Sequence, residues 1–167
     1  MNRKELIEVI KKAFEGVVQP SDITIHVGKA YYSYDYSHDS EHRKKDFVGN
    51  WLDIPSDHIR QCQSALCYVN KVGMRYYLPA YMVWYLNCVD AYDELNNDST
   101  LYALDNHPTN ALGDYFKERF SLFNAEQLNA CALFIKYCAT SPEMAGYSDI
   151  DFAQEKYEGY WSQFEKT

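Results

Sequence analysis

Glycine, proline and basic charge are all scarce in this chain. Of its 167 residues, 7 are Gly and 5 are Pro, and no G-x-G-x-x-G run is present. This pattern argues against a loop that cradles phosphate groups. The net charge of −8 argues against an ordinary nucleic-acid interface, which must be basic to neutralise phosphates.

Long apolar runs are also missing. The longest stretch without a charge or an amide is the eleven residues from Tyr76 to Leu86, whereas a membrane-spanning helix needs about 18 to 20. Arg3 and Lys4 are not followed by the apolar segment and cleavage site of a signal peptide. We therefore expect a cytoplasmic protein that does not associate with membranes.

The cysteines show neither a disulfide framework nor a C-x-x-C metal or redox pair. Their number is odd, and most fall within apolar helical patterns, where reduced core cysteines are common. The alternative is a reactive thiol. The five are Cys62, Cys67, Cys88, Cys131 and Cys138.

Aromatic residues, by contrast, are abundant, with 16 Tyr, 8 Phe and 3 Trp. A chain of this length and composition can bury a real core, so we expect a single domain over residues 1–167. Apolar residues recur at helical spacing along most of it. The expected helices cover about 2–16, 79–94, 111–120 and 150–164, with further helices starting at Ser56 and Asn124.

The helix over 79–94 is apolar on two sides, which predicts that it is central, and Pro79 is expected in its first turn. Asn124 and Gln127 form a capping-box pattern, and Ser56 is the expected N-cap of its helix. The sequence thus predicts an all-α domain of six or seven helices.

Two segments do not follow the helical pattern. Ile23, Ile25 and Val27 alternate with polar residues, which indicates either one short hairpin over residues 23–34 or an irregular segment. Residues 96–110 are rich in Asn, Asp and Ser and are expected to form a loop.

His38 and His42 are the weak candidates for metal ligands, with Asp35 or Glu41 as a possible third. On a helix they would share a face, but the order is not the H-E-x-x-H of zinc proteases. A charged, solvated helix start explains the same residues. We expect no cofactor.

Arg75, next to Tyr76, is a candidate anion clamp, since a guanidinium stacks on rings and binds carboxylate or phosphate. The alternative is that Arg75 pairs with an acidic residue over the core. Acidic residues also cluster near the end of the helix expected over 79–94, namely Asp90, Asp93, Glu94, Asp98 and Asp105. We interpret them as a solvated helix end and not as a catalytic pair of carboxylates.

Tyrosines gather in a segment with weak secondary-structure signals, namely Tyr31, Tyr32, Tyr34 and Tyr36. Tyrosine is favoured where one end of a side chain is apolar and the other is wet, as at protein interfaces. These four are the candidate partner contacts. The alternative is that their rings cover the core.

The string Arg75-Tyr-Tyr-Leu-Pro-Ala-Tyr-Met82, with Phe47-Val-Gly-Asn-Trp51 before it and Phe123-Asn-Ala-Glu-Gln127 after it, resembles a family of small bacterial proteins of unknown function. The resemblance covers about residues 3–138 and leaves 150–164 outside. It implies a bacterial cytoplasmic origin and no catalytic residue.

Two functions are compatible with these observations. The first is a non-enzymatic, immunity-like module that neutralises a basic protein such as a toxin by binding it, since acidic charge speeds association with a basic partner. The second is a small-ligand-binding protein or enzyme with a pocket near residues 75–85.

Overall fold

The computed structural model describes residues 1–90, 98–106 and 111–166, and within them every regular element is helical. The all-α prediction is confirmed, and the possible hairpin is wrong. The longer helices are α1 (Arg3–Ala13), α2 (Ile25–Tyr32), α5 (Lys71–Cys88), α7 (Ala111–Arg119), α8 (Ala125–Thr140) and α9 (Ile150–Gly159). The short ones are α3 (Asp39–Arg43), α4 (Ser56–Gln61), α6 (Ser99–Tyr102), and the 3₁₀ turns η1 (Trp51–Asp53), η2 (Gln63–Cys67), η3 (Pro142–Met144) and η4 (Trp161–Phe164).

Helix α5 is the central element, and it starts earlier than expected. Its N-cap is Asn70, whose side chain accepts hydrogen bonds from the amides of Val72 and Gly73. Pro79 therefore lies inside the helix and not in its first turn. Of the expected range 79–94, residues up to Cys88 belong to α5, and 91–97 lie outside the described residues.

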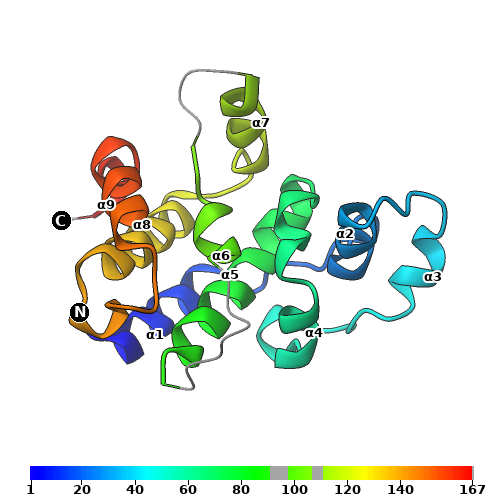
Figure 1. Cartoon of the computed structure of the whole chain (residues 1–167), viewed down its shortest axis with the longest axis horizontal. Helices are drawn as coiled ribbons and strands as arrows, with labels where there is room; N and C mark the ends of the chain where they lie inside the picture. The colour runs from blue at the N-terminus through cyan, green and yellow to red at the C-terminus, as the bar shows by residue number, and fades with distance from the viewer. Residues whose placement is uncertain (91–97, 107–110, 167) are drawn as a thin grey trace.

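Helices α1, α4, α6 and α7 and the turns η1 and η2 pack directly on α5. Figure 1 shows α1, α8 and α9 toward one end of the long axis, and α2 and α3 at the opposite end. One hydrophobic core runs through the described residues and includes Trp51, Tyr81 and Trp161. Tyr81 is fully buried, and its hydroxyl donates to the carbonyl of Cys62 at 2.6 Å. The aromatic residues thus mainly fill this core.

Within segment 23–34, residues Ile25–Tyr32 fold as α2, and the start of this helix is buried. Ile25, His26, Val27 and Gly28 are all buried. Because these consecutive residues are all covered, the start of α2 shows no amphipathic period, and the alternation of β-branched residues indicated a hairpin or an irregular segment. The backbone instead forms helical hydrogen bonds, such as Gly28 N–H to the carbonyl of Thr24 at 2.8 Å.

Helix starts were predicted with mixed success. The capping box of Asn124 and Gln127 is confirmed at α8. Asn2 forms a second box with Glu5. At α4 the expected cap is wrong, since Ser56 is the first helical residue and Pro55 precedes it without a side-chain cap. Within the expected loop 96–110, Ser99–Tyr102 forms α6, whereas 96–97 and 107–110 lie outside the described residues.

Candidate functional site: a tyrosine surface at the end of α2

The C-terminus of α2 carries an exposed aromatic residue in an unusual backbone conformation. Tyr34 has φ +62°, the left-handed region that glycine adopts most easily. Its amide donates to the carbonyl of Tyr31 at 3.0 Å, and the Asp35 amide donates to that of Ala30 at 2.9 Å. This pair of bonds is the Schellman motif that ends many helices, usually with glycine at the left-handed position.

Four tyrosines near this turn make ring contacts with one another, and together with Tyr34 we call them the tyrosine surface: Tyr31, Tyr32, Tyr34, Tyr36 and Tyr68. Tyr34 is 84% exposed, and Tyr32 and Tyr36 are 60% exposed. The ring of Tyr31 lies 5.2 Å from that of Tyr36 and 6.4 Å from that of Tyr68, between centroids. Tyr31 and Tyr68 are half-buried and support the exposed rings.

Side-chain hydrogen bonds fix the segment that follows Tyr34. One carboxylate oxygen of Asp35 is hydrogen-bonded to His38 Nδ1 and the other to His42 Nε2, each at 2.8 Å. The hydrogen bonds from His42 and His38 hold the pKa of Asp35 well below its usual range. The same carboxylate raises the pKa of His38. Tyr31 donates to Asp39 Oδ2 at 2.7 Å and so ties α2 to α3.

The two candidate metal ligands are thus both bonded to one carboxylate. Among the described residues, no group of three or more His, Cys, Asp or Glu side chains is placed to hold a metal ion. The role that His38 and His42 play in the structure is to fix the turn that carries Tyr34 and Tyr36.

A close helix contact brings Tyr68 to this surface. A Cβ built on Gly28 would lie 2.9 Å from the carbonyl oxygen of Ala65, so only glycine lets α2 approach η2 this closely. Tyr68 follows η2 and packs edge-on against Tyr31 and Tyr32. Sequence reasoning missed Tyr68, because no local signal links it to a segment more than thirty positions earlier.

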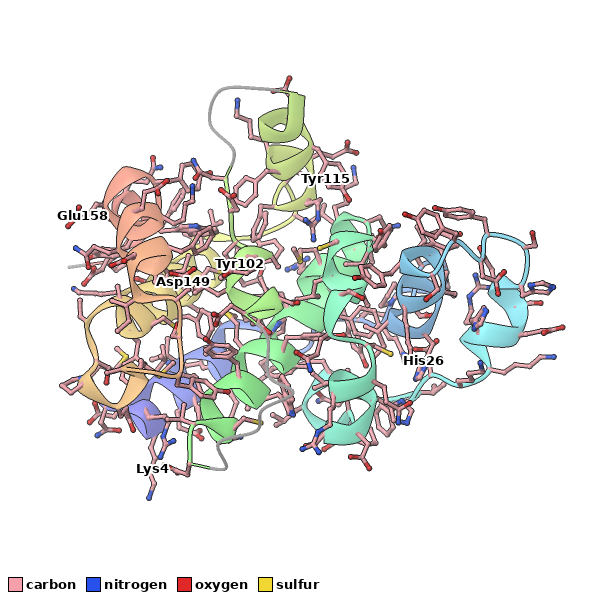
Figure 2. All side chains as sticks on the ribbon, viewed as in Figure 1. Lys4, His26, Tyr102, Tyr115, Asp149 and Glu158 are labelled. Atoms are coloured by element: carbon pink, nitrogen blue, oxygen red, sulfur yellow. The ribbon has the colours of Figure 1, made fainter. Side chains whose placement is uncertain are left out.

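A polar cluster lies at the first turn of α2, around the buried His26, which is labelled in Figure 2, and it includes His58 of α4. His26 Nε2 is 3.2 Å from His58 Nδ1, and His26 Nδ1 is 3.6 Å from Cys62 Sγ. Burial, with help from the nearby charge of His58, lowers the pKa of His26 to about 4. The Asp46 carboxylate accepts from the His26 amide at 3.2 Å, and burial raises its pKa.

Cysteine and histidine side by side suggest nucleophilic chemistry, but the environment opposes it. Cys62 is fully buried, and burial raises its pKa to about 12. A nucleophilic cysteine needs a low pKa and access to substrate, so Cys62 is a packing residue. Cys88, Cys131 and Cys138 are also buried, as expected, whereas Cys67 is exposed beside Tyr68.

Arg75 and Tyr76 lie apart from the tyrosine surface. Tyr76 is fully buried and donates its hydroxyl to the carbonyl of Gly49 at 2.7 Å, which removes it from contact with a partner. The Arg75 Nε donates to Gln127 Oε1 at 3.1 Å, the oxygen that also completes the capping box of α8. Arg75 thus ties α5 to α8 through an amide, not through the acidic residue that was expected.

The described members of the candidate acidic group, Asp90, Asp98 and Asp105, bind different partners. Asp90 pairs with Arg3 at 2.7 Å, and Asp105 with Lys156 at 3.1 Å. Asp98 accepts from the Tyr85 hydroxyl and from the Asp149 amide. Asp149 in turn accepts from Tyr102 at 3.0 Å, and the two are labelled in Figure 2. Asp93 and Glu94 lie outside the described residues.

Fold and surface together define an all-helical protein with one core and an exposed group of tyrosines. The chain belongs to a family of unknown function, DUF6714, whose model matches residues 2–165. The match includes the last helices, which the expected resemblance left outside. No curated protein and no solved structure matches the chain. Among the described residues, no helix is long and apolar enough to cross a membrane.

Proposed function

We propose that this protein is a non-enzymatic module that binds another protein through the tyrosine surface, in the manner of an immunity protein that neutralises its partner. The observation that carries the proposal is Tyr34. Its backbone is held at φ +62° and its ring is 84% exposed. A bulky residue in this conformation costs about 1 to 2 kcal/mol, and its ring takes part in none of the ring contacts among the described residues. Stability therefore does not explain this residue, whereas partner binding does.

The neighbouring residues support the same role. Tyr32 and Tyr36 flank Tyr34 and are each 60% exposed. Tyrosine supplies large, amphipathic contact area at a low cost in side-chain entropy and is enriched where interfaces carry most of their energy. Because Asp35, His38 and His42 fix the turn, the rings are presented in a preset arrangement, which lowers the entropic cost of binding.

The partner we propose is basic, as a nuclease toxin would be, and is met in the bacterial cytoplasm. Residues 90–167 hold 14 of the 24 acidic residues but only 5 of the 16 basic ones. Helices α8 and α9 lie away from α2 in Figure 1. Acidic charge would attract a basic partner over a distance, and the tyrosines would then hold it.

The experiment is site-specific photocrosslinking in cells of the source organism, with p-benzoylphenylalanine in place of Tyr34. Tyr102 is the control position, because it is 48% exposed and is bonded to Asp149 at another part of the surface. We expect one protein to crosslink from position 34 and not from 102. Equal crosslinking from both positions, or none from 34, would contradict the proposal.

The second function is a small-ligand-binding protein or enzyme with a pocket near residues 75–85. Tyr76 is in the core and cannot reach a ligand there. Arg75 lines a hollow of about 220 Å³ together with Val17, Val72 and Leu122, and its Nε is bonded to Gln127.

A further inference from the structure

A hollow of about 270 Å³ lies between η1, α4 and the second half of α5. Trp51 and Ile59 are buried in the core, whereas Leu52 and Ser56 are exposed. The hollow is separate from the tyrosine surface and from Arg75. Its lining includes Trp51, Ile59, Arg60, Val83, Trp84 and Asn87.

The buried residues that line the hollow are apolar, and Trp51 and Trp84 are two of them. The Trp51 Nε1 donates to the carbonyl of Phe14 at 2.9 Å, and the third tryptophan, Trp161, donates to that of Leu104 at 2.9 Å. The Trp84 Nε1, by contrast, has no hydrogen-bond partner among the described residues, although Trp84 is only 5% exposed. An unpaired buried donor is costly, and a ligand oxygen would satisfy it.

The polar groups at the mouth favour a ligand with negative charge. The one charged side chain among the described lining residues is Arg60, a cation, and Ser56 and Asn87 add groups that can donate hydrogen bonds. Concave sites with an apolar floor and a few convergent polar groups are the usual form of small-molecule sites. A carboxylate accepts hydrogen bonds more strongly than a neutral group.

We propose that this hollow binds a small monocarboxylic acid with an apolar body. The body packs on Trp51, Ile59 and Val83, and the carboxylate accepts from the Trp84 indole and lies toward Arg60. The Trp84 Nε1 is covered in the unliganded chain, so the indole must turn slightly toward the hollow when the acid binds. The emission of Trp84 should report that movement.

The test is calorimetric titration with phenylacetate and hexanoate, each compared with its uncharged amide, phenylacetamide and hexanamide. We expect both acids to bind at least about tenfold more tightly than their amides, because a charge-assisted hydrogen bond is lost in the amide. Tryptophan emission should change on addition of either acid. Equal affinity of acid and amide, or no binding of either acid at millimolar concentration, would overturn the proposal.

Two variants locate the site. Trp84→Phe removes the indole N–H but keeps an aromatic ring, and we expect it to lower the affinity for the acids about tenfold while changing that for the amides less. Val83→Phe fills the hollow and should abolish binding of all four probes, with circular dichroism checking that it folds. Unchanged acid affinity in Trp84→Phe would sink the idea, whatever happens to Val83→Phe.

Discussion

Tyr34 occupies a position where glycine would be the stable choice. The φ of +62° costs a residue with a Cβ about 1 kcal/mol relative to glycine. The Tyr34→Gly variant should therefore unfold at a higher temperature and gain about 1 kcal/mol in free energy of unfolding. Thermal and urea unfolding of the two proteins measure this gain.

The matched control is Tyr34→Ala, which removes the ring but keeps the strained Cβ. We expect no gain in stability from it. Partner binding should fall in both variants, because both lose the ring. If Tyr34→Gly gained no stability, or if it bound the crosslinked partner as well as the unmodified protein, the argument from Tyr34 would be wrong.

A second prediction at the scale of one residue concerns the effect of His26 on stability at low pH. Its pKa is about 4 in the folded protein, against an ordinary value of 6.5, because burial and the facing groups His58, Lys29, Lys45 and His42 disfavour its charged form. Between these two pH values the unfolded chain binds the extra proton. Stability should therefore fall as the pH drops from about 6.5 to 4, by at most about 3 kcal/mol from this group. The raised pKa of Asp46 offsets part of that loss, because its carboxyl takes up a proton more readily in the folded state.

Nuclear magnetic resonance titration of the histidine rings measures these values directly. The His26 signals should stay those of a neutral ring down to about pH 4. The midpoint of the His38 titration should lie above pH 6.5, because Asp35 raises the pKa of His38. A His26 that titrates near 6.5 would show that its ring is more hydrated than the structure places it.

At the scale of elements, the contact between α2 and η2 depends on Gly28. Adding a methyl group there would bring it within 2.9 Å of a backbone oxygen of Ala65. Gly28→Ala should therefore destabilise the protein by about 1 to 3 kcal/mol and move Tyr31 and Tyr32 away from Tyr68. Urea unfolding measures the first effect, and crosslinking from position 34 reports the second.

Gly159 is the comparison for that experiment. It ends α9, and a Cβ there would meet nothing within 4 Å. Gly159→Ala should be neutral or stabilising by up to about 1 kcal/mol, because alanine favours helix. Equal destabilisation by the two substitutions would mean that the approach of α2 to η2 is not what Gly28 provides.

The elements also show where local signals are sufficient. The capping box at Asn124 and Gln127 is complete within four residues, so its prediction succeeded. The start of α5 was missed although Asn70 is a good N-cap, because Pro79 was expected in the first turn of the helix. Pro79 is instead buried inside the helix. Gly73 lets Val69 approach closely, since a Cβ there would lie 2.9 Å from the Val69 side chain.

At the scale of the whole molecule, charge and aromatic surface are separated. Residues 1–89 hold 10 acidic and 11 basic residues and carry the tyrosine surface, whereas the acidic excess lies in residues 90–167. Long-range charge acts mainly on association, and buried contacts act mainly on dissociation. Raising NaCl from about 0.05 M to about 0.5 M should therefore slow association with a basic partner at least about tenfold.

The dissociation rate should change little with salt but rise in the Tyr34→Gly variant. Surface plasmon resonance with the crosslinked partner measures both rates. An association rate that does not respond to salt would argue against a basic partner while leaving the tyrosine contact intact. A salt-sensitive dissociation rate would place the contact on the acidic part of the chain, residues 90–167, instead.

The sequence by itself determined the all-helical class, the single set of core-forming aromatics and the best-capped helix start, because periodicity and capping are local properties. It also pointed to Tyr31, Tyr32, Tyr34 and Tyr36 as candidate partner contacts. Only the tertiary structure decided that α2 is a helix, that Tyr76 is buried, and that Tyr68 completes the tyrosine surface. Those outcomes depend on which distant segments cover a residue, and no pattern of neighbours along the chain records that.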